Sequence, residues 1–260
     1  MKVSFDEFIK YKAILLDVGN VIYHDLPVEF AFGFYVFQEL RKYSNIQEDF
    51  FFEFRNSKLN EGNVKWAEEL CVKICKEQSQ SIIFSAWENV LTVWKDISIP
   101  IDGAISKIKE LSKAKSLIIA ANQPVQTLQM LEKNGILNCF TSIFFDSMID
   151  YTKPDVNFYK YILRKIRLMP NDVIMVGDRV DNDIYPSNII GIDTAWIQYK
   201  PLEIKVKHIP LDWQEEYFKN YKLIGMHSVP LINVNKIKVR TKYCANSLAE
   251  LFDFEINGYI

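Results

Sequence analysis

The feature that most constrains the fold is a set of short apolar runs, each of which ends in a polar residue or a glycine. Continuous apolar runs of this length are typical of strands that are buried on both faces, as in a parallel sheet. The runs are AILLDVG (13–19), SLIIAAN (116–122), SIFFDS (142–147), VIMVGD (173–178) and DTAWIQ (193–198). They predict a parallel sheet that is covered by helices on both sides.

From residue 100 onward, stretches with helical periodicity separate these runs. The apolar side chains of each stretch recur at helical spacing, and one stretch ends near Asn134-Gly135, which is a signal for the end of a helix. Helices are predicted over residues 102–114, 124–136 and 155–166. Alternation of strands and helices predicts an α/β fold with a doubly wound parallel sheet.

Residues 25–99 have a different composition. They are rich in aromatic residues and helix formers, and few of their runs indicate buried strands. Amphipathic helices are predicted over residues 30–43, 64–78 and 82–96. We therefore expect an inserted α-helical cap domain at 25–99 and an α/β core that comprises residues 1–24 and 100–260.

The end of the chain holds an expected insertion in the core. Residues 244–256 are predicted to form a closing helix, which leaves residues 203–240 between it and the last predicted strand. This segment includes a β-rich stretch at 229–239. We expect it to pack locally on the core or to mediate self-association, for instance as a homodimer.

Charge and cysteine content exclude several classes of protein. The formal net charge of −2 provides no basic field for nucleic acid, and no run of about 18 apolar residues indicates a membrane span. The N-terminal residues have no apolar segment typical of a signal peptide. The four cysteines include no C-x-x-C pair, so we expect reduced thiols in a cytoplasmic protein.

Polar residues follow several of the predicted strands. In an open parallel sheet, ligands bind at the carboxyl ends of the strands, so these residues should converge. They are Asp17, Asn122, Lys153, Asp178, Asp181 and Asp183. Clustered acids repel one another unless a hard cation such as Mg²⁺ lies among them, and a lysine can neutralise a carboxylate or a bound phosphoryl group. Of the acids in the last loop, Asp181 is expected to be solvated.

Four segments resemble motifs of the haloacid dehalogenase (HAD)-like hydrolase superfamily, subfamily I, whose helical C1 cap follows the first motif. In order, LLDVGNV, LIIAAN, YTKPDVNFY and VGDRVDND are similar to the four motifs, and NEGNVKWAEEL is similar to a common cap signature. The resemblance covers roughly residues 12–200. Each segment alone is weak evidence for membership of this superfamily. Four segments in the right order, with a cap of the right length between the first and the second, are strong evidence.

The resemblance implies a Mg²⁺-dependent phosphatase of a small phosphorylated metabolite. Asp17 would be the nucleophile that becomes an aspartyl phosphate, which water then hydrolyses. Lys153 would hold Asp17 and the phosphoryl oxygens by its charge. Backbone amides that follow Asp17, including that of Asn20, would cradle the phosphate together with the loop at Ala121 and Asn122.

The resemblance also implies the ligands of the Mg²⁺ ion. Asp17 and Asp178 would bind the ion through carboxylate oxygens, and Gly19 through its backbone carbonyl. Asp183 would lie behind these ligands and support them.

Two positions depart from the pattern of the superfamily's phosphatases. Gly19 stands where these enzymes usually carry an aspartate that acts as general acid and base, a contribution of about 10²–10⁴-fold. Ala121 stands where a serine or threonine hydroxyl usually binds phosphate, and one such hydrogen bond contributes about 1 kcal/mol. His24, in the following loop, is a candidate replacement for the acid.

Three functions remain open from the sequence. The first is the phosphatase described above. The second is a catalytically impaired binding or regulatory protein that retains the fold and the metal site. The third is a dehalogenase, which is disfavoured because Gly19 replaces the usual aromatic residue and the expected arginine is not evident.

Overall fold

The computed structural model describes residues 1–61, 63, 65–224 and 240–254 of the chain. The chain divides into two compact units. The α/β unit comprises Met1–His24, Pro100–Lys200 and Leu231–Ile260, and the helical unit comprises Asp25–Ile99 and Pro201–Pro230.

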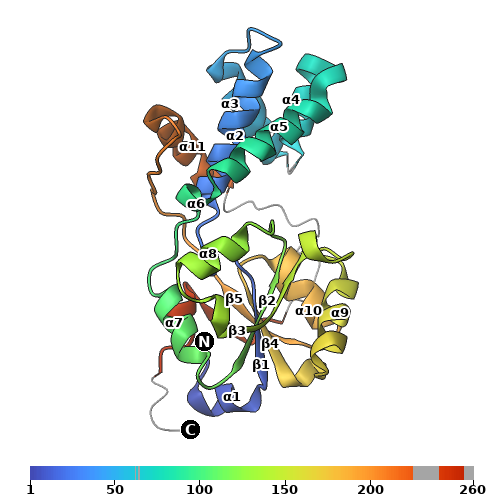
Figure 1. The fold of residues 1–260 in the computed structure, drawn as a ribbon, viewed down its shortest axis with the longest axis vertical. Helices are drawn as coiled ribbons and strands as arrows, with labels where there is room; N and C mark the ends of the chain where they lie inside the picture. Colours follow the sequence, from blue (N-terminus) through green and yellow to red (C-terminus); the bar gives the residue numbers. More distant parts are fainter. Residues whose placement is uncertain (62, 64, 225–239, 255–260) are drawn as a thin grey trace. The chain divides into compact units, whose positions relative to one another are not determined.

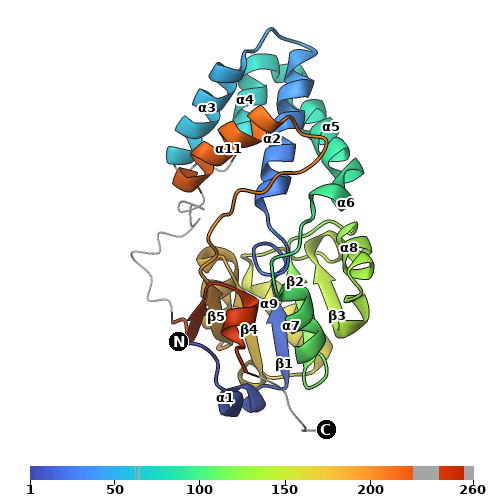
Figure 2. The same ribbon diagram turned by 90° about the vertical axis from the view of Figure 1, so that its left-hand side faces the viewer.

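The α/β unit is built on one parallel sheet, which confirms the predicted sheet (Figure 2). The strands are β1 (Ala13–Leu16), β2 (Ser116–Ala121), β3 (Phe140–Phe145), β4 (Val173–Gly177), β5 (Asp193–Ile197) and β6 (Tyr243–Ala245). Their order across the sheet is β3-β2-β1-β4-β5-β6. The chain therefore runs outward from β1 through β2 to β3, and then returns to the other side of β1, where β4 begins the second half of the sheet. All four residues of β1 are buried, as its central position requires.

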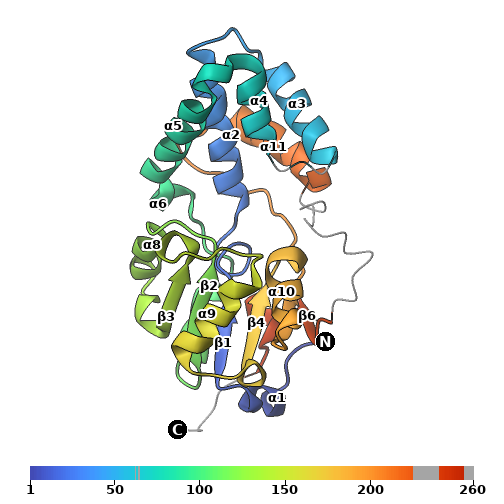
Figure 3. The ribbon, with the colours of Figure 1, turned by 90° about the vertical axis from the view of Figure 1, so that its right-hand side faces the viewer.

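Helices cover both faces of this sheet. Figure 1 shows α7 and α8 on one side of the strands and α9 and α10 on the other. The helices of the unit are α1 (Phe5–Lys10), α7 (Ala104–Leu111), α8 (Thr127–Lys133), α9 (Val156–Ile166), α10 (Tyr185–Ile189) and α12 (Leu248–Leu251). Short 3₁₀ turns lie at Leu137–Cys139, Asp146–Met148 and Pro170–Asp172. Helix α9 lies across the sheet (Figure 3), and its Phe158, Tyr159 and Ile162 join one apolar cluster with the strand residues Leu15 and Met175.

The C-terminal segment differs from the predicted single helix. Tyr243–Ala245 forms β6, which pairs in parallel with the edge strand β5, and among the described residues of this segment, up to 254, Leu248–Leu251 is the helical part. The Tyr-Cys-Ala run satisfies the open edge of β5 through backbone hydrogen bonds. Ser247 then begins the helix, because its side chain accepts a hydrogen bond from the Glu250 amide.

In the helical unit, a block of helices follows β1 in the chain. Its helices are α2 (Leu26–Arg41), α3 (Glu48–Asn60), α4 (Trp66–Cys75), α5 (Ser79–Thr92), α6 (Trp94–Ile97) and α11 (Leu211–Ile224), with a 3₁₀ turn at Lys76–Gln78. The predicted helix over 82–96 is thus two helices, α5 and α6. None of the helices that the described residues form is both long enough and apolar enough to cross a membrane.

Helix α11 belongs to the helical unit, although residues 203–240 were expected to be an insertion of the core. It lies beside α2 and α3 (Figure 2). Trp213 is buried among the aromatic rings of these helices, and its indole donates a hydrogen bond to the Phe30 carbonyl at 3.1 Å. Tyr217 approaches α2 at Gly33, where a Cβ atom would lie 2.9 Å from the tyrosine ring. The predicted β-rich stretch at 229–239 lies outside the described residues.

Arg55 connects α3 to α11 inside the helical unit. Its side chain is buried, and its guanidinium lies 3.7 Å from the centre of the Tyr217 ring and 5.6 Å from the Trp66 ring. A desolvated guanidinium over an aromatic face is a favourable cation–π contact. Trp66 and Tyr217 therefore act in packing within this unit.

We expect the Trp213→Ala variant to lose about 3–5 kcal/mol of unfolding free energy, because truncating a buried tryptophan removes apolar contacts and leaves a cavity. Chemical denaturation followed by circular dichroism measures this loss. The matched control is Leu211→Ala, because Leu211 is on the same helix but is 55% exposed. Equal stability of the two variants would contradict the assignment of α11 to the packed interior of the helical unit.

Candidate active site

Three carboxylates converge at one edge of the sheet. Asp17 follows β1 and Asp178 follows β4, and these strands are paired neighbours. Asp183 lies in the π-helical turn η5 (Val180–Ile184) just beyond Asp178. One carboxylate oxygen of each lies within 4.8 Å of the others. The acids therefore meet where the strand order reverses, which is the usual ligand site of an open α/β sheet.

Lys153 bridges two of these acids. Its Nζ atom lies 2.8 Å from Oδ1 of Asp17 and 2.6 Å from Oδ1 of Asp183, and the lysine side chain is 2% exposed. Burial lowers the pKa of Lys153, but the charges of Asp17 and Asp183 outweigh this effect and raise the pKa above its ordinary value. Lys153 is therefore a buried cation whose charge is held between two carboxylates.

Asn122 fixes the backbone that carries Lys153. Its side-chain amide donates to the Lys153 carbonyl at 3.0 Å, and its side-chain oxygen accepts from the Lys153 amide at 2.9 Å. This two-bond contact joins the end of β2 to the loop before α9. Ala121, the last residue of β2, is fully buried.

Asp183 is held from two directions. Lys153 contacts one carboxylate oxygen, and the backbone amide of Arg179 donates to the other at 3.0 Å. Burial and the nearby charge of Asp17 raise the pKa of Asp183, and Lys153 offsets part of this shift. At Gly177 a Cβ atom would lie 2.3 Å from the Asp183 carboxylate, so only glycine permits this close approach.

The turn after β1 brings a further side chain to the acids. Asn20 has a positive φ of 52°, and its side-chain amide donates to Oδ2 of Asp178 at 3.0 Å. Gly19 and Tyr23 form an isolated β-bridge, which closes the turn. The indole of Trp196, on β5, donates to the backbone carbonyl of Asp178 at 2.8 Å. The sequence did not identify Trp196, because nothing in its local pattern marks it as a partner of this loop.

The expectation that Asp181 is a solvated loop acid is wrong. Asp181 is buried, and Arg179 contacts both of its carboxylate oxygens, with Nε at 3.1 Å and Nη2 at 2.6 Å. A two-bond contact between guanidinium and carboxylate allows the acid to leave solvent at low cost. The opposite charges two residues apart in D-R-V-D were the available signal for this pair.

His24 lies in a more enclosed environment than expected for a surface loop. Its ring is buried, and its Nδ1 atom is 2.5 Å from the hydroxyl of Tyr199. Burial lowers the pKa of His24, and the charge of Asp102 offsets part of this effect. The imidazole is therefore mainly neutral at pH 7, which opposes its use as a proton donor at that pH.

The donor set fits a hard divalent cation. Carboxylate oxygens are the ligands that Mg²⁺ prefers, and here three carboxylates lie together while Lys153 contacts two of them, Asp17 and Asp183. A bound cation would offset the repulsion among the three carboxylates that the charge of Lys153 does not neutralise. Asp17 and Asp178 are placed to hold such an ion, with Asp183 beside them.

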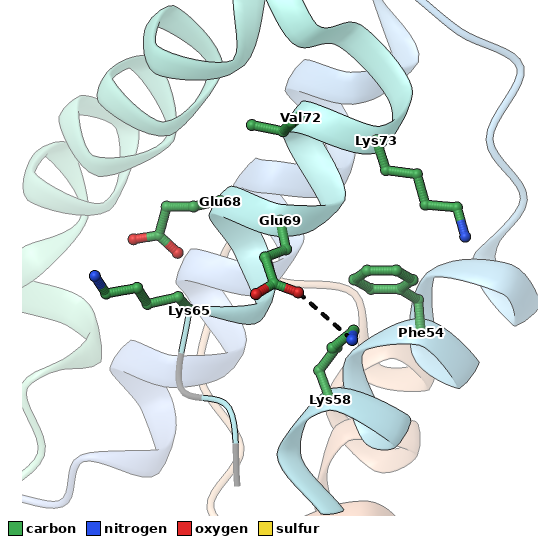
Figure 4. A pocket seen from close by; sticks show the side chains of 7 residues that line it. All are labelled: Phe54, Lys58, Lys65, Glu68, Glu69, Val72 and Lys73. Atoms are coloured by element: carbon green, nitrogen blue, oxygen red, sulfur yellow. Dashed lines mark ion pairs between the residues drawn. The ribbon is translucent and has the colours of Figure 1, made fainter. Parts of the chain in front are cut away.

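A pocket of about 530 Å³ lies elsewhere, on the helical unit (Figure 4). Its lining consists of Phe54, Lys58, Lys65, Glu68, Glu69, Val72 and Lys73. Lys58 and Glu69 pair across it at 3.5 Å. None of the residues that the sequence predicts to carry chemistry lines this pocket.

The chain is similar to known proteins in both sequence and fold. The family model of haloacid dehalogenase-like hydrolases matches residues 11–185. The chain is 24% identical over 208 residues to a glyceraldehyde 3-phosphate phosphatase from Pyrococcus furiosus, an alignment that covers 78% of this chain and 77% of the relative.

Solved structures show the same fold at lower sequence identity. A HAD phosphatase from Thermococcus onnurineus superposes with a TM-score of 0.61 and 17% identity, and the match covers 92% of this chain and 95% of that one. The HAD-hydrolase YfnB from Bacillus subtilis, solved with bound magnesium, superposes with a TM-score of 0.55 and 17% identity over 83% of this chain and 99% of that one.

The buried His24 makes stability depend on pH. Because its pKa is lower in the folded protein, the unfolded chain takes up a proton first as the pH falls below about 6.5. The contribution of the neutral His24 side chain to the unfolding free energy is therefore complete above that pH and is lost as the pH falls below it. When the pH is lowered from about 7.5 to about 5, we expect the unfolding free energy of His24→Gln to decrease less than that of the wild type. Denaturant titrations at both pH values measure this difference, and an equal loss in the two proteins would contradict the inference.

Proposed function

Since the chain belongs to the haloacid dehalogenase-like hydrolase family, we propose that it is a Mg²⁺-dependent phosphatase of a small phosphorylated metabolite. The observation that carries this proposal is the position of Asp17. Its carboxylate is held at 2.8 Å by the buried cation Lys153, and it lies beside the carboxylates of Asp178 and Asp183. A carboxylate fixed by a neighbouring cation at the end of a central strand is well placed to attack a bound phosphoryl group.

In the first proposed step, an Asp17 carboxylate oxygen attacks phosphorus. A bond forms between this oxygen and phosphorus, and the bond from phosphorus to the leaving oxygen breaks. The leaving alkoxide must take up a proton. In the second step, water attacks phosphorus, which releases inorganic phosphate and restores the Asp17 carboxylate.

Lys153 stabilises the charge that develops on the phosphoryl oxygens, because its ammonium is fixed before the substrate arrives. When bound, Mg²⁺ supplies Lewis-acid stabilisation of the same charge. Backbone amides after Asp17 and at the end of β2, near Ala121 and Asn122, would bind the phosphoryl oxygens. The Asn20 amide would not take part, because it already donates to the Tyr23 carbonyl at 2.7 Å. The carbonyl of Gly19 would hold the metal together with the carboxylates of Asp17 and Asp178.

Gly19 determines which substrates react well. Without an acidic side chain at this position, the leaving oxygen takes its proton from water, because His24 is mainly neutral at pH 7. Substrates with good leaving groups, such as aryl and acyl phosphates, therefore react faster than alkyl phosphates. Ala121 weakens phosphate binding, because it lacks a hydroxyl group whose hydrogen bond would contribute about 1 kcal/mol.

The relative from Pyrococcus furiosus gives the first natural candidate to test. It is named for the hydrolysis of glyceraldehyde 3-phosphate. We propose a small phosphorylated metabolite of this kind for the present chain, with glyceraldehyde 3-phosphate as the first compound in a substrate panel.

The Asp17→Asn variant tests the nucleophile. We expect it to lose hydrolysis of p-nitrophenyl phosphate and acetyl phosphate in the presence of Mg²⁺, by at least about 10³-fold, because an amide cannot form the covalent intermediate. Asp172→Asn is the matched control, since Asp172 precedes β4 at the opposite end of the sheet.

An unchanged rate in Asp17→Asn would refute the nucleophile assignment. A folded wild-type protein that binds the metal but hydrolyses neither compound nor glyceraldehyde 3-phosphate would instead favour the binding or regulatory function. Gly19 and Ala121 are the specific observations that support this second candidate.

The Gly19→Asp variant tests the missing acid. We expect it to raise turnover of an alkyl phosphate by about 10²-fold, and to raise turnover of p-nitrophenyl phosphate much less, because only the poor leaving group needs protonation. Gly19→Asn has a similar side-chain volume without an acidic proton and serves as the control. Equal gains on both substrates, or equal gains in both variants, would count against protonation as the limiting step.

A further inference from the structure

We infer that Asn20 is a positioning residue that orients Asp178 for the bound cation through its side-chain amide. This inference rests on the proposed function, because it concerns the same metal site. It assigns to Asn20 a task that differs from binding phosphate through its backbone.

The backbone at Asn20 does not by itself explain the side chain. Its φ of 52° is in the left-handed region, where both glycine and asparagine are accepted. The turn is closed by main-chain groups, since the Asn20 amide donates to the Tyr23 carbonyl at 2.7 Å. Glycine would satisfy these requirements equally well. What asparagine adds is a donor, and that donor is 3.0 Å from Oδ2 of Asp178.

This contact connects the two loops that carry the proposed ligands. Asn20 belongs to the turn after β1, which also holds Asp17, whereas Asp178 follows β4. The Asp178 backbone is already fixed by Trp196, whose indole donates to its carbonyl at 2.8 Å. The Asn20 amide then fixes the carboxylate. Both the backbone and the side chain of Asp178 are therefore held from neighbouring strands.

The charge of the donor is important. Lys153 contacts Asp17 and Asp183, so its positive charge is shared between those two carboxylates. The contact from Asn20 comes from a neutral amide, which orients a carboxylate without cancelling its charge. Partners that hold a ligand in this way typically affect metal affinity by about 10–100-fold when they are removed.

The test compares Mn²⁺ binding by the wild type and by Asn20→Gly, followed by electron paramagnetic resonance without substrate. Mn²⁺ is the probe because it takes the same oxygen ligands as Mg²⁺. Glycine suits the positive φ, so the variant should fold. We expect its Mn²⁺ dissociation constant to rise by about 10–100-fold. The Mg²⁺ concentration for half-maximal phosphatase activity should rise in parallel.

The matched control is Asn246→Gly, which also removes an amide-to-carboxylate hydrogen bond, here from Asn246 to Glu250 at 2.8 Å. It should bind Mn²⁺ like the wild type. Thermal unfolding in the presence of a chelator separates stability from binding. If Asn20→Gly unfolds at a lower temperature but binds Mn²⁺ as tightly as the wild type, Asn20 is purely structural and the inference is overturned. If the wild type itself binds no Mn²⁺, the proposed metal site fails as well.

Discussion

The ion contacts of Lys153 are the interaction on which the candidate site depends. One buried ammonium lies between Asp17 and Asp183, which come from the loops after two different strands. Two carboxylates this deeply buried would repel each other and favour protonation if the cation were absent. The backbone of Lys153 is in turn fixed by Asn122 at the end of β2. Loops that follow β1, β2 and β4 are thus tied together at one point, which prepares the site before any substrate binds.

Much of this arrangement could be predicted from the sequence. The apolar runs located β1 through β5, and the polar residues after them identified Asp17, Lys153, Asp178 and Asp183 as neighbours. The reason is that a parallel sheet brings the carboxyl ends of its strands together, so a local pattern is enough to place these side chains.

The features that sequence reasoning missed depend on contacts between distant segments. Asp181 is an exception, because its partner Arg179 lies only two residues before it. Burial of His24, by contrast, depends on Tyr199, which is far away in the chain. Likewise, the docking of Trp213 and Tyr217 on α2 and α3 depends on a space at Gly33 that no local pattern reveals. The predicted helix over 244–256 includes Cys244 and Ala245 of β6, because the strand conformation of these residues depends on pairing with β5, which the local sequence does not reveal.

The central claim is that Asp17 becomes phosphorylated, and mass spectrometry of the trapped intermediate tests it most directly. The protein would be mixed with acetyl phosphate and Mg²⁺, quenched in acid within the first turnover, and digested. The proposed mechanism predicts a phosphoryl group on the peptide that contains Asp17, and none on that peptide in Asp17→Asn. Turnover without any such adduct, or an adduct on a different residue, would contradict the assignment of Asp17 as the nucleophile.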